Sequence, residues 1–171
     1  MENKNVNKKY QTQVSSVVFM WFSVVLSLIA LLMMFVPQIH YFGRDYAATY
    51  NNLFFNGKIS SGSIYSIGAW PSFVGYILIA IAVVVIFVLA LPTFQPSFET
   101  EKIMLFGGIG LNTLGSLLVW FTLIWYAIAQ GETNFLGNWD YCYMQPGVYI
   151  AGSLSLLSAL SCFKAYRIDS K

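Results

Sequence analysis

Four long runs of apolar residues, separated by polar stretches, dominate the chain. The clearest run is 73–91, FVGYILIAIAVVVIFVLAL, which has no charged or strongly polar side chain. A helix of about 20 residues crosses the hydrocarbon core of a bilayer, whereas a single strand would leave its backbone groups unpaired in lipid. We therefore expect helical membrane spans at about 14–36, 69–92, 103–129 and 147–166, with outer loops at 37–68 and 130–146.

The composition agrees with this membrane assignment. Hydrophobic residues make up 57% of the 171 residues and charged residues 9%, against roughly 25% charged residues in ordinary soluble domains. The formal net charge of +2 is too small to indicate a nucleic-acid partner. The predicted fold class is all-α, with a single integral membrane domain over residues 1–171 that forms a four-helix bundle.

Basic residues are distributed unevenly between the two predicted membrane faces. The outer face has only Arg44 and Lys58. The inner face has the other seven basic residues, which are Lys4, Lys8, Lys9, Lys102, Lys164, Arg167 and Lys171. Because cytoplasmic loops carry the excess of lysine and arginine, we expect both termini in the cytoplasm and a multi-pass protein of the cell membrane.

The first outer loop is rich in Tyr, Phe, Asn, Ser and Gly, and its turn-forming pairs predict short strands joined by turns. Its segment 46–55 fits either one strand of a hairpin or a short amphipathic helix on the membrane. Both outer loops are dense in aromatic residues, which are enriched at protein interfaces. Two alternatives stay open: the loops contact a partner, or they pack on each other as a cap. The candidate contact residues are Tyr46, Tyr50, Phe54, Phe55, Trp139 and Tyr141.

Small residues recur at helical spacing in the third and fourth spans. Small side chains let helix backbones approach closely in lipid, where no hydrophobic effect drives helices together. The pattern favours packing of these two spans on each other; the alternative is a partner-binding stripe or a solute path. The second span, with only Gly75 and a few alanines, is expected to face lipid. The packing or interface candidates are Gly108, Asn112 and Ser116, and Gly147, Ala151, Ser155 and Ala159.

The sequence offers little catalytic chemistry. Ionisable residues are missing from the apolar interior of the spans, which argues against a proton-coupled or ion-coupled transporter. Cys142 and Cys162 are expected near opposite membrane faces, too far apart for a disulfide, and with the single His40 they are too few for a metal site. The Gly107–Gly110 cluster resembles a dinucleotide fingerprint, but no strand precedes it. We expect no metal and no cofactor.

Four residues of the outer loops are candidates for an acid–base site, although a solvated surface is the simpler interpretation. They are His40, Asp45, Glu132 and Asp140. An enzyme of this kind would require His40 and Asp140 to lie close together. We expect a protein that is not an enzyme.

Two resemblances to known proteins follow from these features. The topology is similar to that of claudin-like tetraspan proteins, but the first outer loop lacks their Trp-Gly-Leu-Trp and paired-cysteine signature. The chain more closely resembles small bacterial four-span membrane proteins of uncharacterised function. This resemblance is carried by Phe35-Val36-Pro37, by segment 50–57 and by the small-residue segment 147–152. It implies a four-span fold in a bacterial cytoplasmic membrane, and no catalytic residues.

The expected function is non-enzymatic, with the lipid bilayer and another membrane protein or further copies of the chain as partners. The favoured hypothesis is an accessory or scaffolding subunit of a membrane complex. The alternative is a passive channel or transporter component for a small solute. A pore requires a continuous polar lining through the bundle, whereas a scaffold has a dry core.

Overall fold

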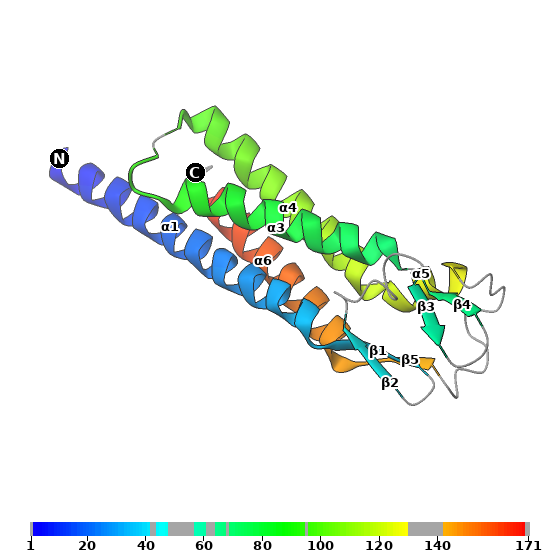
Figure 1. Ribbon diagram of the computed structural model, residues 1–171. Helices are drawn as coiled ribbons and strands as arrows, with labels where there is room; N and C mark the ends of the chain where they lie inside the picture. The colour runs from blue at the N-terminus through cyan, green and yellow to red at the C-terminus, as the bar shows by residue number, and fades with distance from the viewer. Residues whose placement is uncertain are drawn as a thin grey trace.

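The computed structural model describes residues 2–41, 44–47, 57–60, 64–67, 69–94, 96–129 and 142–169. These residues form an elongated bundle of long helices with short strands at one end (Figure 1). The long helices are α1 (Glu2–Leu32), α3 (Trp70–Ala90), α4 (Phe98–Trp120) and α6 (Pro146–Asp169). Four segments that lie on these helices are long and apolar enough to cross a membrane. The predicted all-α, four-helix membrane fold is confirmed.

The four helices form a ring. Helices α1 and α4 each pack mainly against α3 and α6, so α1 and α4 face each other across the bundle. The beginning of α1 and the end of α6 lie at the end of the bundle opposite the strands (Figure 1). Four crossings therefore bring both ends of the chain to one side.

The first span ends two residues before Pro37. Helix α1 runs without interruption from the polar N-terminal segment into the apolar segment Val14–Phe35, which finishes in the 3-10 helix η1 (Met33–Phe35). Val36 is extended, with φ −89° and ψ 146°. Proline disfavours helical geometry in the residue before it, so Pro37 turns the chain from helix into strand.

Prolines also mark the beginnings of two later spans. Pro71 is the second residue of α3, and Pro146 is the first residue of α6. Proline suits the first turn of a helix because its missing N–H would have no intrahelical acceptor. Helix α4 begins with a different signal, since Ser97 Oγ accepts a hydrogen bond from the Thr100 N–H (3.3 Å) as an N-cap.

The third span, expected as one helix to residue 129, is divided at Phe121 into α4 and the short helix α5 (Thr122–Ala129). Phe121 departs from helical geometry, with φ −86° and ψ 20°. The side chains of Ser72 and Trp125 donate hydrogen bonds to the Leu118 carbonyl beside the break (3.3 and 2.9 Å). A break at membrane depth is tolerated when protein groups satisfy the backbone in this way. No proline marks this break, so the sequence pattern did not predict it.

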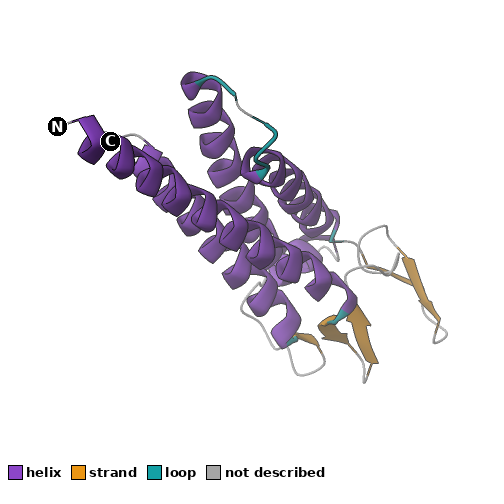
Figure 2. Ribbon diagram, turned by 90° about the vertical axis from the view of Figure 1, so that its left-hand side faces the viewer, coloured by secondary structure: helices purple, strands orange, loops and turns teal. Residues whose placement is uncertain are grey.

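Strands from the two loops 37–68 and 130–146 form a three-stranded antiparallel sheet in the order β2-β1-β5, at one end of the bundle (Figure 2). Its strands are β1 (Pro37–Tyr41), β2 (Arg44–Ala47) and β5 (Cys142–Met144). Strand β1 is central because it pairs with β2 of its own loop and with β5 of the other loop. Loops 37–68 and 130–146 are therefore joined by backbone hydrogen bonds.

A second, two-stranded antiparallel sheet consists of β3 (Gly57–Ser60) and β4 (Ile64–Ile67). The expectation of short strands in the first outer loop is confirmed. Within the ambiguous segment 46–55, Tyr46 and Ala47 belong to β2, and residues 48–55 lie outside the described residues.

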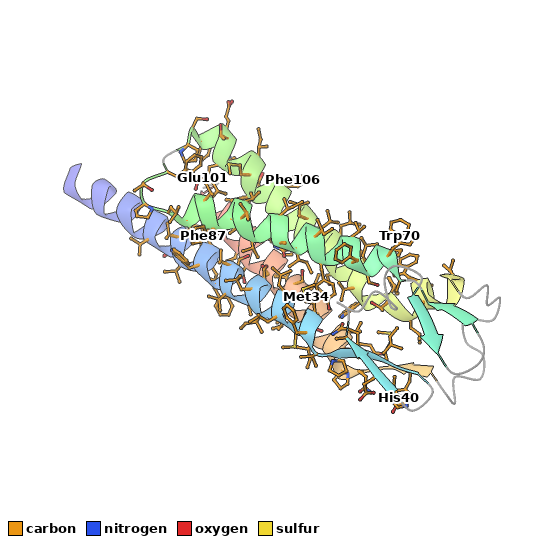
Figure 3. All side chains as sticks on the ribbon, in the orientation of Figure 1. Met34, His40, Trp70, Phe87, Glu101 and Phe106 are labelled. Carbon is orange, nitrogen blue, oxygen red and sulfur yellow. The ribbon has the colours of Figure 1, made fainter. Side chains whose placement is uncertain are left out.

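Helix α3 does not face lipid more than its neighbours, and that expectation was wrong. A larger share of α3 than of α1 or α4 is buried. Its Gly75 lies against Gly115 of α4, where a Cβ added at Gly75 would be 2.9 Å from the Gly115 carbonyl oxygen. Glycine at both positions allows the two backbones to touch. The exposed apolar side chains face outwards along the bundle; Trp70 and Phe106, 63% and 70% exposed, are examples (Figure 3).

Candidate functional site

Polar side chains from three helices meet in the interior of the bundle. We call them the polar seam, which consists of Ser23 and Ser27 from α1, Asn112 and Ser116 from α4, and Ser155, Ser158 and Cys162 from α6. All seven side chains are buried. Helix α3 faces the seam with apolar residues, and its Ile86 packs at Gly108 of α4.

Helices α1 and α6 are held together by serine hydroxyl groups. Ser158 Oγ donates to the Ser23 carbonyl (2.9 Å), and Ser27 Oγ lies within hydrogen-bonding distance of Ser158 Oγ (2.7 Å). The Ser23 and Ser158 hydroxyl groups are also hydrogen-bonded to each other, and Ser23 Oγ lies 3.1 Å from Cys162 Sγ. In lipid, such interhelical hydrogen bonds contribute about 0.6–2 kcal/mol each.

Asn112 connects α4 to both of these helices. Ser27 Oγ donates to Asn112 Oδ1 (2.9 Å), and Ser155 Oγ donates to the Asn112 carbonyl (2.9 Å). One turn further along α4, Ser116 Oγ donates to the Gly152 carbonyl (2.7 Å). The seam therefore fixes the relative rotation and height of α1, α4 and α6.

The structure brings most of the expected small-residue positions into the bundle. Asn112 and Ser116 face α6 and meet Ser155 and the Gly152 backbone, while Ala151 and Ala159 are buried. Gly108 lies closest to Ile86 of α3, with Cys162 of α6 slightly farther away. Gly147 lies at the sheet, because a Cβ there would be 2.6 Å from the Gln38 side-chain nitrogen and 2.8 Å from the Pro37 carbonyl oxygen.

The sequence analysis did not single out the serines of α1. Ser16, Met20, Ser23, Ser27 and Ala30 are all buried, and they recur at alternating spacings of four and three residues, as the buried face of a helix does. This regular spacing of small and polar residues was the available signal. It predicts a buried face but not which helix covers that face.

A second buried polar group, the Gln38 junction, lies where the sheet meets the helices. Gln38 Nε2 donates to the carbonyls of Met33 (2.6 Å) and Val36 (2.8 Å), and its Oε1 accepts from the Tyr76 hydroxyl (2.8 Å). The Gln38 carbonyl accepts from the Gln145 N–H (2.9 Å). Gln38 and Tyr76 are 1% and 2% exposed. The side chain of Gln38 thus connects the end of the first span with α3, and its backbone belongs to the sheet.

The sheet carries an exposed polar cluster. His40 Nδ1 and Asp45 Oδ1 are 2.8 Å apart, and the Gln145 side-chain amide donates to the same carboxylate oxygen (2.8 Å). The His40 ring stacks on Tyr143, with ring centroids 4.6 Å apart. His40, labelled in Figure 3, lies at the end of the molecule opposite the termini. We call His40, Asp45, Tyr143 and Gln145 the sheet cluster.

Several candidates of the outer loops are not placed by the structure. Tyr46 pairs with Ile39 across β2 and β1. Tyr50, Phe54, Phe55, Trp139, Tyr141, Glu132 and Asp140 lie outside the described residues. Within the described ranges, three or more His, Cys, Asp or Glu side chains do not come together as a metal site would require.

The fold and the buried seam define an integral membrane protein that has four spans. Comparison of the chain with protein-family models, with curated proteins and with solved structures gives no match.

Proposed function

We propose that this protein is a non-enzymatic accessory or scaffolding subunit of a membrane complex, as its bacterial resemblance also suggests. The observation that carries the proposal is the closed interior of the bundle. The seam hydroxyl groups bind neighbouring helices instead of lining an open path, and Ser27, Ser155 and Ser158 are each fully buried. A passive channel would need polar groups that continue beyond the seam.

Apolar side chains occupy the bundle on both sides of the seam. Towards the sheet, a buried cluster includes Ile79, Val119 and Val148. Towards the termini, a second buried cluster includes Ile86 and Leu105. In the part of the chain that the structure describes, these apolar clusters interrupt the polar seam at both ends, which supports a scaffold over a continuous polar path.

We place the sheet outside the cell and the termini in the cytoplasm. Seven of the nine basic residues lie in segments at the end of the bundle that holds the two termini. Cytoplasmic segments of membrane proteins carry such an excess of lysine and arginine. Lys102 and Lys164 direct their ammonium groups over the rings of Phe98 and Phe19 (4.0 and 6.0 Å). Lysines at the edge of a membrane snorkel in this manner, with the stem in apolar surroundings and the charge near water.

The partner in this proposal is another membrane protein that contacts the sheet end of the molecule. Tyr143 is 49% exposed and stacked on His40. Aromatic residues held rigidly at a surface are typical of protein interfaces. The proposal thus assigns the bundle to membrane anchoring and the sheet cluster to recognition.

Purification from the native membrane in a mild detergent tests the function. We expect a second protein at fixed stoichiometry, and we expect the double variant Tyr143→Ala, Asp45→Ala to lose it. Ile103→Ala, an exposed position on α4, is the matched control and should retain the partner. A monomer or homo-oligomer alone, combined with solute flux in liposomes, would support the channel hypothesis instead.

A further inference from the structure

The polar seam forms a ring of contacts that is open at one point. Its sequence of hydrogen-bonding contacts runs through Asn112, Ser27, Ser158, Ser23 and Cys162. Cys162 lies near Gly108 of α4, because a Cβ added at Gly108 would be 3.9 Å from Cys162 Sγ. The series of contacts therefore comes back to α4. Gly108 precedes Asn112 by one helical turn. The gap in the ring therefore lies between Cys162 and Asn112.

The amide of Asn112 is satisfied on one side only. Its Oδ1 accepts from Ser27 and lies 3.3 Å from Ser155 Oγ. Its Nδ2 has no hydrogen-bond partner among the described residues, although the side chain is 0% exposed. A buried donor without an acceptor is strongly unfavourable, and lipid offers none from outside. The amide therefore requires a partner in the gap.

A half-turn of the amide does not remove this requirement. It would direct the Asn112 nitrogen towards the hydroxyl oxygens of Ser27 and Ser155, and a hydroxyl oxygen can accept a hydrogen bond as well as donate one. The amide oxygen would then face the gap and need a donor. A partner that both donates and accepts fits either orientation, and water is the smallest such molecule.

Gly108 contributes no side chain to the interior of the bundle one turn before Asn112. Helical side chains lean towards the N-terminus of their helix, and Gly108 belongs to the turn on that side of Asn112. Gly108 is buried between Ile86 and Cys162, and an added Cβ would be 3.0 Å from Ile86 Cγ1. Since Gly108 has no side chain, the space beside the amide is not filled from α4.

We propose that this notch, bounded by Gly108, Asn112 and Cys162, binds one buried water molecule. The water would bond to the Asn112 amide, to Cys162 Sγ and to Ser23 Oγ, and so close the ring. Buried waters typically make about three hydrogen bonds to otherwise unsatisfied groups. The neutral side chains of the seam favour water over an ion, because a buried ion without a counter-charge is expensive.

A high-resolution structure of the full chain in lipid nanodiscs tests the water directly. We expect a density peak about 2.7–3.2 Å from the Asn112 amide and within contact of Cys162. A well-resolved amide that bonds directly to a protein atom, with no peak in the notch, would overturn the proposal.

Thermal unfolding of alanine variants gives a second test. Gly108→Ala fills the notch, and Gly110→Ala is the matched control because a Cβ there meets nothing within 4 Å. We expect Gly108→Ala to lower the midpoint by at least about 2–4 °C and Gly110→Ala to leave it unchanged or raise it.

The background variant Asn112→Leu separates hydration from packing, because Gly108→Ala also approaches Ile86. Leucine needs no hydrogen-bond partner, so Gly108→Ala should lower the midpoint less in Asn112→Leu than in the native chain. Equal losses in both backgrounds would mean that crowding against Ile86 explains the whole effect, and would contradict the water site.

Discussion

Ser27 of α1 donates a hydrogen bond of 2.9 Å to Asn112 of α4, across the diagonal of the bundle. These two helices pack mainly on α3 and α6 and only slightly on each other. The bond therefore joins two helices that apolar packing does not hold together directly. Apolar faces in lipid tolerate sliding and rotation, whereas a buried hydrogen bond has one acceptable geometry. We infer that the seam selects a single arrangement of the ring.

Asn112→Leu should destabilise the bundle by about 0.6–2 kcal/mol, because it removes the interhelical hydrogen bond from Ser27. Unfolding in mixed detergent, followed by circular dichroism, measures the change. Thr113→Val is the matched control, since Thr113 Oγ1 donates only to the Ile109 carbonyl of its own helix. Equal losses for the two variants would refute the role of the seam.

Gly115→Ala should separate α3 from α4. A Cβ at Gly115 would lie 2.7 Å from Ile79 Cγ1 and 2.8 Å from the Gly75 carbonyl oxygen, and overpacking of this kind costs about 1–3 kcal/mol. Gly107→Ala adds the same methyl group to the same helix, where nothing lies within 4 Å. The thermal midpoint should fall for Gly115→Ala alone, and a similar fall for Gly107→Ala would contradict the close backbone contact.

Tyr76→Phe should loosen the Gln38 junction. It removes the donor to the buried Gln38 Oε1, at a cost of about 1–3 kcal/mol. We expect faster hydrogen exchange in β1, because Gln38 belongs to that strand. Tyr149→Phe is the control, as Tyr149 is 54% exposed. The double variant Tyr76→Phe, Gln38→Leu measures the coupling. If its loss of stability equals the sum of the losses of the two single variants, the two side chains are not coupled.

Asp45→Asn should leave the unfolding of the bundle almost unchanged. The Asp45 side chain is 49% exposed, and exposed ion pairs contribute only about 0–1 kcal/mol. The same variant should weaken recovery of a partner, if the sheet cluster recognises one. A large fall in thermal stability would instead assign Asp45 to the structure of the cap.

Labelling of single cysteines tests the orientation. In a chain without the two native cysteines, an impermeant maleimide added to intact cells should label Tyr143→Cys of β5, because Tyr143 is 49% exposed. Thr93→Cys, in a chain without the two native cysteines, should be labelled only after the membrane is opened, because exposed Thr93 lies in the connection between α3 and α4 at the terminal end. The reverse result would place the sheet in the cytoplasm.

The four spans, their approximate ends and the strands of the first outer loop were predictable from local patterns. Lipid permits only helices for runs such as 73–91, and Pro37, Pro71 and Pro146 limit what the backbone can do beside them. These constraints act within a few residues. They do not depend on how the helices pack in the tertiary structure.

The neighbours of each helix were not predictable in the same way. Helical spacing shows that Gly108, Asn112 and Ser116 share a side of α4, but it does not show that Gly108 meets α3 while Asn112 meets α1 and α6. The burial of α3 includes a close backbone contact between Gly75 and Gly115 of α4. The break at Phe121 depends on donors from Ser72 and Trp125. Each of these features requires a distance between segments far apart in the chain, and such distances exist only once all four helices are packed.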